Sequence, residues 1–271
     1  MMKNRLVLSI CVAGLTLRSV AVPFAQQNWG SDDWCSGEQW GRDRQGVCDV
    51  RQFTMGAPAT LAVDAEPNGG IQVRGGARGD VRIYAKVVAT ADSEQRAGEI
   101  ANAVRIDAAG DRVTAEGPSG MARNENWHVS YRIEVPTMSS LNLRSANGGL
   151  TVHDVEGKME LRTVNGGVNL RNVAGEVTAR TSNGGIDVDL DGSSWVGAGL
   201  DVETANGGVR LRLPENYSAR LEASTHNGGL QVDFPVQMQN LRSKEISANI
   251  GAGGPTIKVK TSNGGVRISK K

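Results

Sequence analysis

The chain is poor in aromatic residues and carries no excess of charge of either sign. Aromatic side chains make up 4% of its 271 residues, whereas glycine occurs 35 times, which favours thin, turn-rich β structure over a thick globular core. The 30 basic and 29 acidic residues leave a net charge of +1 and are mixed along the sequence. Because there is no Lys/Arg run and no aromatic stacking platform, the sequence gives no support for nucleic-acid binding.

Motifs for catalysis and metal binding are also missing. The sequence contains neither a serine nucleophile elbow nor a phosphate-binding loop. The histidines His128, His153 and His226 lack the spacing of metal ligands, and no aspartate recurs at one repeat position as repeat-bound calcium requires. We therefore expect no catalytic, cofactor-binding or metal-binding residues, and no cofactor.

What the chain does contain is the tripeptide Asn-Gly-Gly, seven times. The steps between its middle copies are 18, 18, 23 and 21 residues. A repeat of this length cannot bury a hydrophobic face alone, so it must stack on its neighbours. The copies begin at Asn68, Asn147, Asn165, Asn183, Asn206, Asn227 and Asn263.

Residues on both sides of the tripeptide alternate between apolar and polar. In one copy Leu200, Val202 and Thr204 alternate with Asp201 and Glu203, and the other regular copies follow the same pattern. Apolar residues at alternate positions return directly after the glycines. A period of two predicts strands with one buried face, so each unit reads as strand, Asn-Gly-Gly turn, strand and second turn.

Two architectures fit such units. Asn-Gly between alternating strands is a strong hairpin signal, which would give an antiparallel meander closed into a sandwich or barrel. Equivalent positions match in residue type from repeat to repeat, however, as stacked coils require. We therefore predict an all-β fold, a β-solenoid resembling a single-stranded β-helix with repeats of about 18–23 residues.

In such a stack the asparagines form a ladder along one corner, which we interpret as structural hydrogen bonding between coils, with a ligand-binding corner as the alternative. The copy at Asn68 is left out because it is off register and follows Pro67. The predicted ladder consists of Asn147, Asn165, Asn183, Asn206, Asn227 and Asn263.

Residues 1–25 read as a secretory signal peptide. Basic residues precede an apolar run at 6–17 that is too short to span a membrane, and Ala21 and Ala25 are candidate cleavage positions. Lipidation at Cys11 is an alternative that the preceding isoleucine disfavours. No later segment is apolar enough to cross a bilayer, so we expect no transmembrane segment in the mature chain.

Residues 26–52 are rich in tryptophan and keep the remaining two cysteines. In an exported chain Cys35 and Cys48 are expected to form a disulfide, worth roughly 3 kcal/mol in the chain-entropy model. The tryptophans form either a carbohydrate- or surface-contact patch or a cap over the open end of the solenoid. They are Trp29, Trp34 and Trp40.

Two further regions complete the predicted organisation. Residues 53–139 are a divergent β region with one short helix near 92–104, capped by Asp92 or Ser93. Residues 140–271 form the regular Asn-Gly-Gly region. We expect one continuous β structure rather than two independent domains.

These motifs resemble the DUF4097 family of bacterial exported β-strand-repeat proteins, which are often called adhesins. The resemblance rests on Thr-x-Asn-Gly-Gly followed by alternating apolar residues, as in 181–188, and on the stretches 62–71 and 127–136. It extends from about residue 48 to residue 269. It implies a β-solenoid-like fold and a cell-envelope location, and it implies no catalytic residues.

The first functional hypothesis is a non-catalytic exported protein of the periplasm or cell surface that binds an unknown protein or glycan. Its candidate contact face is the outward column of Arg144, Arg162 and Arg180. A periplasmic structural or signalling module is an alternative without an adhesive role. Arg78-Gly79-Asp80 matches an integrin-binding tripeptide, but nothing else in the sequence suggests a host-cell ligand.

The other functional class is a polysaccharide-processing enzyme. Its best candidates are Asp187, Asp189 and Asp191, which alternate onto one strand face. A glycosidase needs two carboxyl groups roughly 5–9.5 Å apart, a spacing that residues two apart on a strand can meet. A solvated acidic face is the simpler interpretation.

Overall fold

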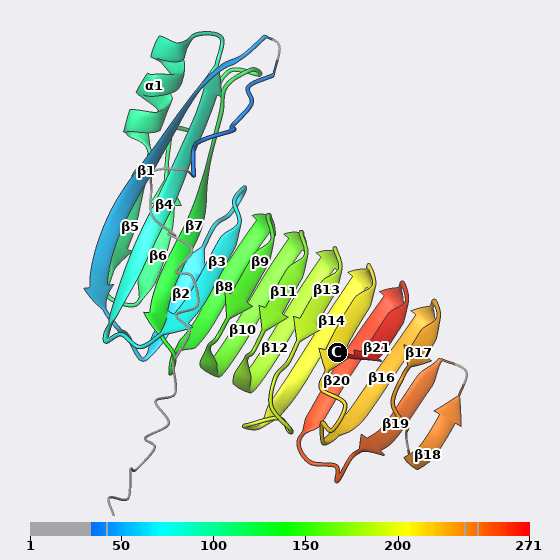
Figure 1. Ribbon diagram of the computed structural model, residues 1–271. Helices are drawn as coiled ribbons and strands as arrows, with labels where there is room; N and C mark the ends of the chain where they lie inside the picture. The colour runs from blue at the N-terminus through cyan, green and yellow to red at the C-terminus, as the bar shows by residue number, and fades with distance from the viewer. Residues whose placement is uncertain (1–33, 42, 236, 243) are drawn as a thin grey trace, which may run out of the picture.

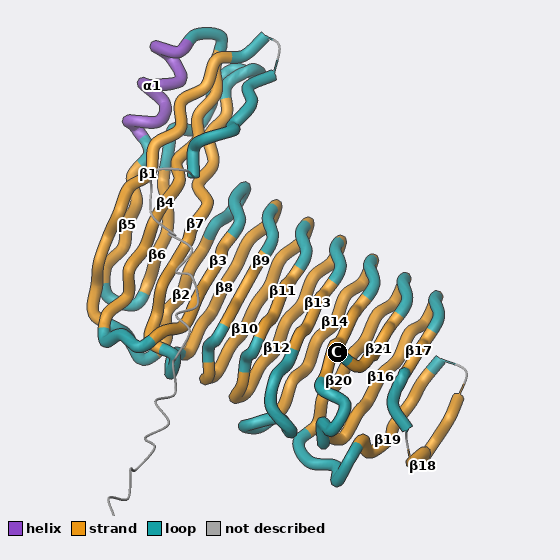
Figure 2. Tube along the Cα trace, in the orientation of Figure 1, coloured by secondary structure: helices purple, strands orange, loops and turns teal. Residues whose placement is uncertain are grey.

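The computed structural model describes residues 34–41, 43–235, 237–242 and 244–271, so the predicted signal peptide, Cys11 and Trp29 lie outside the described residues. As predicted, the fold is mostly β, with one helix beside two mixed sheets (Figures 1 and 2). Apolar side chains between the sheets form a thin core that runs the length of the coil stack.

The first sheet has ten strands. Their spatial order is β1 (Gln45–Gly56), β4 (Asp80–Ala91), β7 (Asn126–Pro136), β3 (Ile71–Gly76), β9 (Leu150–His153), β11 (Val168–Arg171), β13 (Ile186–Asp189), β15 (Val209–Leu213), β21 (Val266–Lys270) and β17 (Leu230–Val232).

The second sheet has eleven strands. Their spatial order is β18 (Gln237–Arg242), β19 (Glu245–Ile250), β16 (Ala219–Asn227), β20 (Thr256–Asn263), β14 (Gly199–Asn206), β12 (Ala174–Asn183), β10 (Glu156–Asn165), β8 (Ser140–Asn147), β2 (Thr60–Asp64), β6 (Arg112–Glu116) and β5 (Arg105–Ala109).

Each regular repeat forms one coil, with its first strand in the eleven-stranded sheet and its second in the ten-stranded sheet. Neighbouring coils pair in parallel and in register, so that Met159 lies opposite Val177 and Asn165 opposite Asn183. Apolar residues at alternate positions point inward and are buried. Parallel pairing of equivalent residues gives a β-solenoid-like fold rather than the antiparallel meander.

A continuous ladder of asparagine side chains follows one corner of the stack. Each Nδ2 donates a hydrogen bond to Oδ1 of the asparagine in the adjacent coil, at 2.8–2.9 Å. The ladder begins at Asn68, which bridges to Asn147, so the prediction that left Asn68 out was wrong. The bonded order is Asn68, Asn147, Asn165, Asn183, Asn206, Asn263 and Asn227.

Beside this ladder, a buried Ser or Thr hydroxyl of each coil donates to the carbonyl of the first glycine in the preceding coil of the stack. Thr204, for example, bonds the carbonyl of Gly184 at 2.8 Å. The glycine is needed because backbones approach closely there: a Cβ on Gly184 would lie 2.1 Å from the carbonyl oxygen of Gly166. The buried hydroxyl and the first glycine of each repeat thus set the distance between neighbouring coils.

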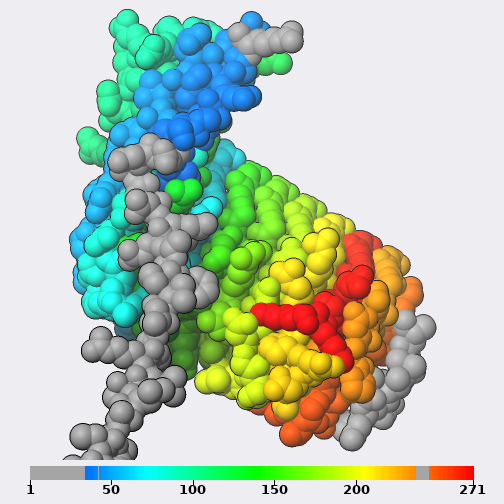
Figure 3. Space-filling view, viewed as in Figure 1, coloured from blue at the N-terminus to red at the C-terminus, as the bar shows by residue number. Residues whose placement is uncertain are grey.

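The order of the last coils differs from their order in the sequence. β20 and β21 come last in the sequence, but they lie between the coil of β14–β15 and that of β16–β17. The C-terminus therefore lies within the stack (Figure 1), and the last coil is seen between the yellow and orange coils in Figure 3. The β18–β19 hairpin instead covers the far side of β16.

The N-terminal part of the molecule is built differently. Strands β1, β4 and β7 pair antiparallel and rise above the coil stack, where helix α1 (Glu94–Ala103) packs on β1 and β4 (Figure 1). The helix begins, as predicted, with Ser93 as its N-cap. Its C-terminal carbonyls accept hydrogen bonds from Arg51 of β1.

Candidate functional site

The three arginines of the predicted contact face lie side by side on the outer surface of the eleven-stranded sheet. Arg144 of β8 is in register with Arg162 of β10, which is in register with Arg180 of β12. Each stands three residues before the corner asparagine of its coil, at an outward position of the period-two pattern. The parallel register therefore turns a sequence column into a row of guanidinium groups.

These arginines line a shallow groove of about 460 Å³ that runs along the asparagine corner. Val164 stands in the groove and is 46% exposed, an unusual position for a large apolar side chain. Apart from Ala205, the remaining lining residues are polar or charged, and two of them are carboxylates. The lining residues are Glu66, Arg144, Ser145, Arg162, Thr163, Val164, Arg180, Thr181, Ser182, Glu203, Ala205 and Ser262.

The three arginines of the groove differ in their ion pairing. Arg180 bonds Asp201 at 3.0 Å and Glu203 at 3.1 Å, and the hydrogen bond to Asp201 raises the pKa of its guanidinium. Arg162 contacts Glu160 at 2.6 Å, yet its side chain stays 61% exposed. Within the described part of the chain Arg144 has no ion pair, although Asp64 of β2 lies opposite it and Glu66 lines the same groove.

A rigid floor supports the groove. Thr163 and Thr181 point inward beneath it and donate to glycine carbonyls of the neighbouring coils at 2.8 Å. Both side chains are at most 6% exposed. Because these hydroxyls and the asparagine ladder fix each coil relative to the next, the arginines project from a preformed surface.

The aspartates proposed for an enzyme are ion-paired. Asp187 and Asp189 lie on β13 of the opposite sheet, but Asp191 lies beyond the end of that strand, so the prediction that all three share one strand face was wrong. Asp187 pairs with Arg210 at 3.2 Å, Asp189 pairs with Arg212 at 2.9 Å, and Asp191 pairs with Lys271 at 2.6 Å. Each carboxylate thus faces a cation of a neighbouring coil or of the C-terminus. This arrangement matches a solvated, charge-paired face better than an acid–base pair.

The histidines are dispersed. Burial lowers the pKa of His128 on β7, and burial together with Arg171 lowers the pKa of His153 on β9. His226 is exposed beside the corner of its coil. Among the described residues, no group of three His, Cys, Asp or Glu side chains is placed to hold a metal ion.

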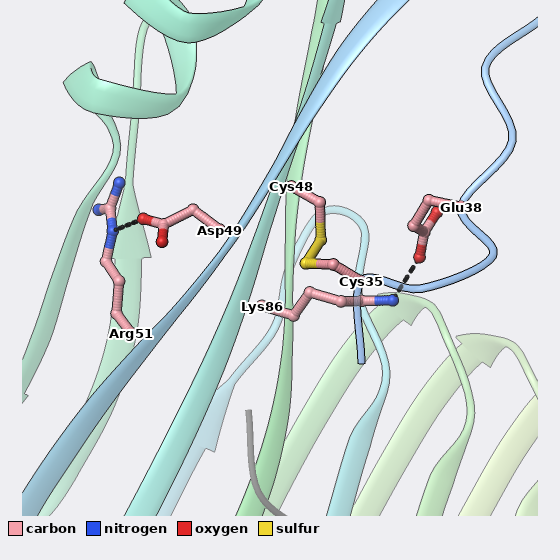
Figure 4. The surroundings of a disulfide bond; sticks show 6 residues. All are labelled: Cys35, Glu38, Cys48, Asp49, Arg51 and Lys86. Carbon is pink, nitrogen blue, oxygen red and sulfur yellow. Dashed lines mark hydrogen bonds and ion pairs between the residues drawn. A yellow bond between two sulfur atoms is a disulfide. The ribbon is translucent and has the colours of Figure 1, made fainter. Parts of the chain in front are cut away.

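The N-terminal segment lies on the outer face of the β1–β4–β7 sheet. Cys35 and Cys48 form a disulfide with a Cα–Cα distance of 5.8 Å (Figure 4). Trp34 stacks on Arg132, whose guanidinium carbon is 4.2 Å from the ring centroid, and Lys86 lies 5.3 Å away. This places Trp34 against a sheet face, so it does not cover the open end of the stack as a cap would.

Two neighbouring contacts hold the same segment. Lys86 of β4 bonds Glu38 at 2.5 Å, beside the disulfide (Figure 4). Trp40 packs directly over Gly46, where a Cβ would lie 2.2 Å from the ring. Both described tryptophans of the segment are therefore engaged by β1, β4 or β7, which weakens the hypothesis of a tryptophan contact patch.

The Arg-Gly-Asp tripeptide is also engaged within the protein. Arg78 pairs with Asp80 at 2.9 Å and with Glu134 of β7, and its side chain is 15% exposed. A tripeptide that binds a receptor must present its guanidinium outward. The arginine here instead joins the start of β4 to β7.

The structure also shows groove features that the sequence analysis missed. Val164 and Glu66 line the groove, although the first is a variable repeat position and the second precedes the irregular first copy. An apolar residue at a position otherwise held by small, polar or His residues was the available signal for Val164. Glu66 had no such signal, because its place depends on β2 pairing with β8.

No helix in the described part of the chain has the length and apolar character needed to traverse a lipid bilayer.

Together, the parallel coils, the asparagine corner and the mixed-charge outer faces define a β-solenoid-like repeat protein. The chain belongs to the Toastrack DUF4097 family, whose model matches residues 77–269. This establishes the family that the sequence motifs resemble. No curated protein matches the chain.

The chain is similar to several solved structures at low sequence identity and low TM-score. A "putative cell adhesion protein" from Clostridium sporogenes is 12% identical with a TM-score of 0.45, covering 84% of this chain and 100% of its own. A "putative adhesin" from Bacteroides fragilis is 12% identical with a TM-score of 0.43, covering 83% and 97%. A "putative lipid binding protein" from Parabacteroides distasonis is 9% identical with a TM-score of 0.30, covering 83% and 96%. Likeness at this level carries no argument about function.

Proposed function

We propose that this protein is an exported, non-catalytic binding protein of the cell envelope, and that the arginine groove is its contact site. One observation carries the proposal: three arginines of consecutive coils line one groove around an exposed valine. A rigid row of guanidinium groups beside an apolar side chain suits a partner with repeated negative charge, whether an acidic protein segment or an acidic glycan.

The electrostatics favour binding over catalysis. The groove combines cations with only two carboxylates, Glu66 and Glu203, and Glu203 is held by Arg180 and Lys260. On the opposite sheet the aspartates considered for glycoside hydrolysis are ion-paired. No observation on the described residues favours the polysaccharide-processing enzyme over the binding protein.

Charge reversal tests the contact site. The variant Arg162→Glu with Arg180→Glu should weaken binding of the purified chain to envelope fractions of its own cells by more than about tenfold, or roughly 1.4 kcal/mol. The matched control reverses Arg210 and Arg267, which line a groove on the opposite sheet and are 72% and 58% exposed, against 61% and 38% for Arg162 and Arg180.

Equal binding by both variants and the parent would reject the groove as the contact site. Treating the envelope fraction with protease or with periodate before the assay separates a protein partner from a glycan.

Protease treatment of intact cells tests the location. Cleavage of the folded chain in intact cells, with a periplasmic marker protected, supports a role at the cell surface. Protection until the outer layer is opened supports a periplasmic scaffold or signalling module and argues against direct adhesion.

A further inference from the structure

The coil formed by β20 and β21 occupies a slot between two coils that precede it in the sequence. We define the slot as the space between the coil of β14–β15 and the coil of β16–β17. On one wall β20 pairs with β14 over Gly199–Asn206, and on the other it pairs with β16 over Arg220–Asn227. β21 pairs in the same way with β15 and β17.

The gap between these two walls follows from a crossing earlier in the chain. After β15, residues 214–218 pass to β16 two coil positions along the stack, which leaves one position between the two coils. The amide of Ser218 donates to the carbonyl of Ser193 at 2.7 Å, and Tyr217 is buried. Glu215 of the crossing also pairs with Lys270 of β21, so the contacts that hold the crossing lie partly outside the slot and partly within it.

The inserted coil is held in the slot by the same kinds of contact that join the other coils of the stack. Thr261 donates to the carbonyl of Gly207, and Thr225 of the far wall donates to the carbonyl of Gly264, both at 2.8 Å. Asn263 links Asn206 to Asn227 in the ladder. The inward side chains of the inserted coil are at most 2% exposed, namely Ile257, Val259, Val266 and Ile268.

The inserted coil is joined to β19 by a glycine-rich turn. Gly251, Gly253 and Gly254 of this turn have positive φ. The terminal coil of a second copy presents the same residues, so it fits the vacated slot equally well.

We propose that the slot is an exchange site for a second copy of this chain. Two copies trade the segment from Thr256 to Lys271, so that each terminal coil fills the other molecule's slot. The contacts of residues 256–271 with the slot are kept in such a dimer, and only the turn at 251–255 changes path. The inference goes beyond the proposed function and does not depend on the arginine groove.

Cysteine pairing between copies tests the exchange. Asp201 of β14 lies opposite Lys258 of β20 on the outer face. Neighbouring strands are about 4.8 Å apart, within the range that a disulfide bridges. One batch carries Asp201→Cys and an affinity tag, and an untagged batch carries Lys258→Cys, both in a Cys11→Ser background. After incubation together in sub-denaturing urea and removal of the urea, covalent dimers of one tagged and one untagged chain are expected.

Two controls make the result decisive. The single-chain variant with both Asp201→Cys and Lys258→Cys should form an internal disulfide, which shows that the pair is bridgeable and that the variant folds. The matched mixture of Glu160→Cys with Thr178→Cys uses facing residues of two internal coils. This mixture should give no covalent dimer. If the internal disulfide forms but the Asp201/Lys258 mixture gives no more dimer than the Glu160/Thr178 mixture, exchange is rejected.

A peptide competition checks that the slot itself is used. A synthetic peptide of residues 255–271, added in excess, should suppress formation of the mixed dimer. The same peptide with Gly264→Ala should not suppress it, because the new Cβ would lie 2.1 Å from the carbonyl oxygen of Gly207. Equal suppression by both peptides would show that the dimer forms elsewhere.

Discussion

In the repeat half, residues 140–271, each regular coil meets its neighbours through the same contacts, whereas the contacts that hold residues 34–139 mostly occur once. An amide ladder, a hydroxyl–carbonyl row and a column of closely packed glycines recur in the first case. A disulfide, a helix held by Arg51 and a tryptophan stacked on Arg132 hold the second. Because its contacts recur, the repeat half can be predicted from the sequence. The other half depends on contacts that each occur once, and these leave no repeating pattern.

Adding one methyl group to a glycine of the repeat half should cause the greatest loss of stability. In Gly184→Ala the Cβ would meet the backbone of Gly166, which cannot rotate away. We expect a loss of about 3 kcal/mol or more in the free energy of unfolding, at the upper end for an overpacked site. Urea denaturation followed by circular dichroism measures it.

The control for this change lies in the other half. A Cβ added to Gly98 in α1 would meet no atom within 4 Å, so Gly98→Ala should stabilise the protein by about 0.5–1 kcal/mol through helix propensity. If both substitutions had the same effect, close packing of the glycine column would not be what positions the coils.

The next effect concerns the N-terminal half. Replacing both Cys35 and Cys48 by serine should lower the free energy of unfolding by about 2–3 kcal/mol, because the disulfide restricts the unfolded chain. Hydrogen exchange should rise in residues 34–41 and β1 and stay unchanged in β10 and β12. Equal increases in both regions would show that the two halves unfold as one unit.

Removing one buried hydroxyl group from the repeat half should lower the free energy of unfolding by a smaller amount. In Thr204→Val the carbonyl of Gly184 loses its side-chain donor in a site with no exposed surface, which should cost about 1–2 kcal/mol. Thr178→Val, on the outward face of β12, should change stability by less than about 0.5 kcal/mol. A comparable loss in both variants would mean that β-sheet propensity, and not the buried hydrogen bond, explains the threonine column.

The predictability of the candidate site follows the same division. The arginine row could be anticipated, because period-two alternation puts residues three before each asparagine outward and parallel stacking aligns them. The pairing of Arg180 with Asp201 and Glu203 also depended only on the next repeat in sequence. The contribution of Glu66 was not predictable, since it requires β2 to join the stack beside β8 from about eighty residues away.

Alternation, capping and the Asn-Gly-Gly spacing are local signals, so the strands, their buried faces, the helix near 92–104 and the family could be predicted from the sequence. The order of the coils, the membership of Asn68 in the ladder and the position of the tryptophan segment depend on contacts between residues far apart in the chain. These contacts were not predictable because equivalent repeats present the same pairing surface. The local pattern therefore predicts how a coil pairs but not which coil it pairs with. Connections between coils, such as residues 214–218, set the order of pairing.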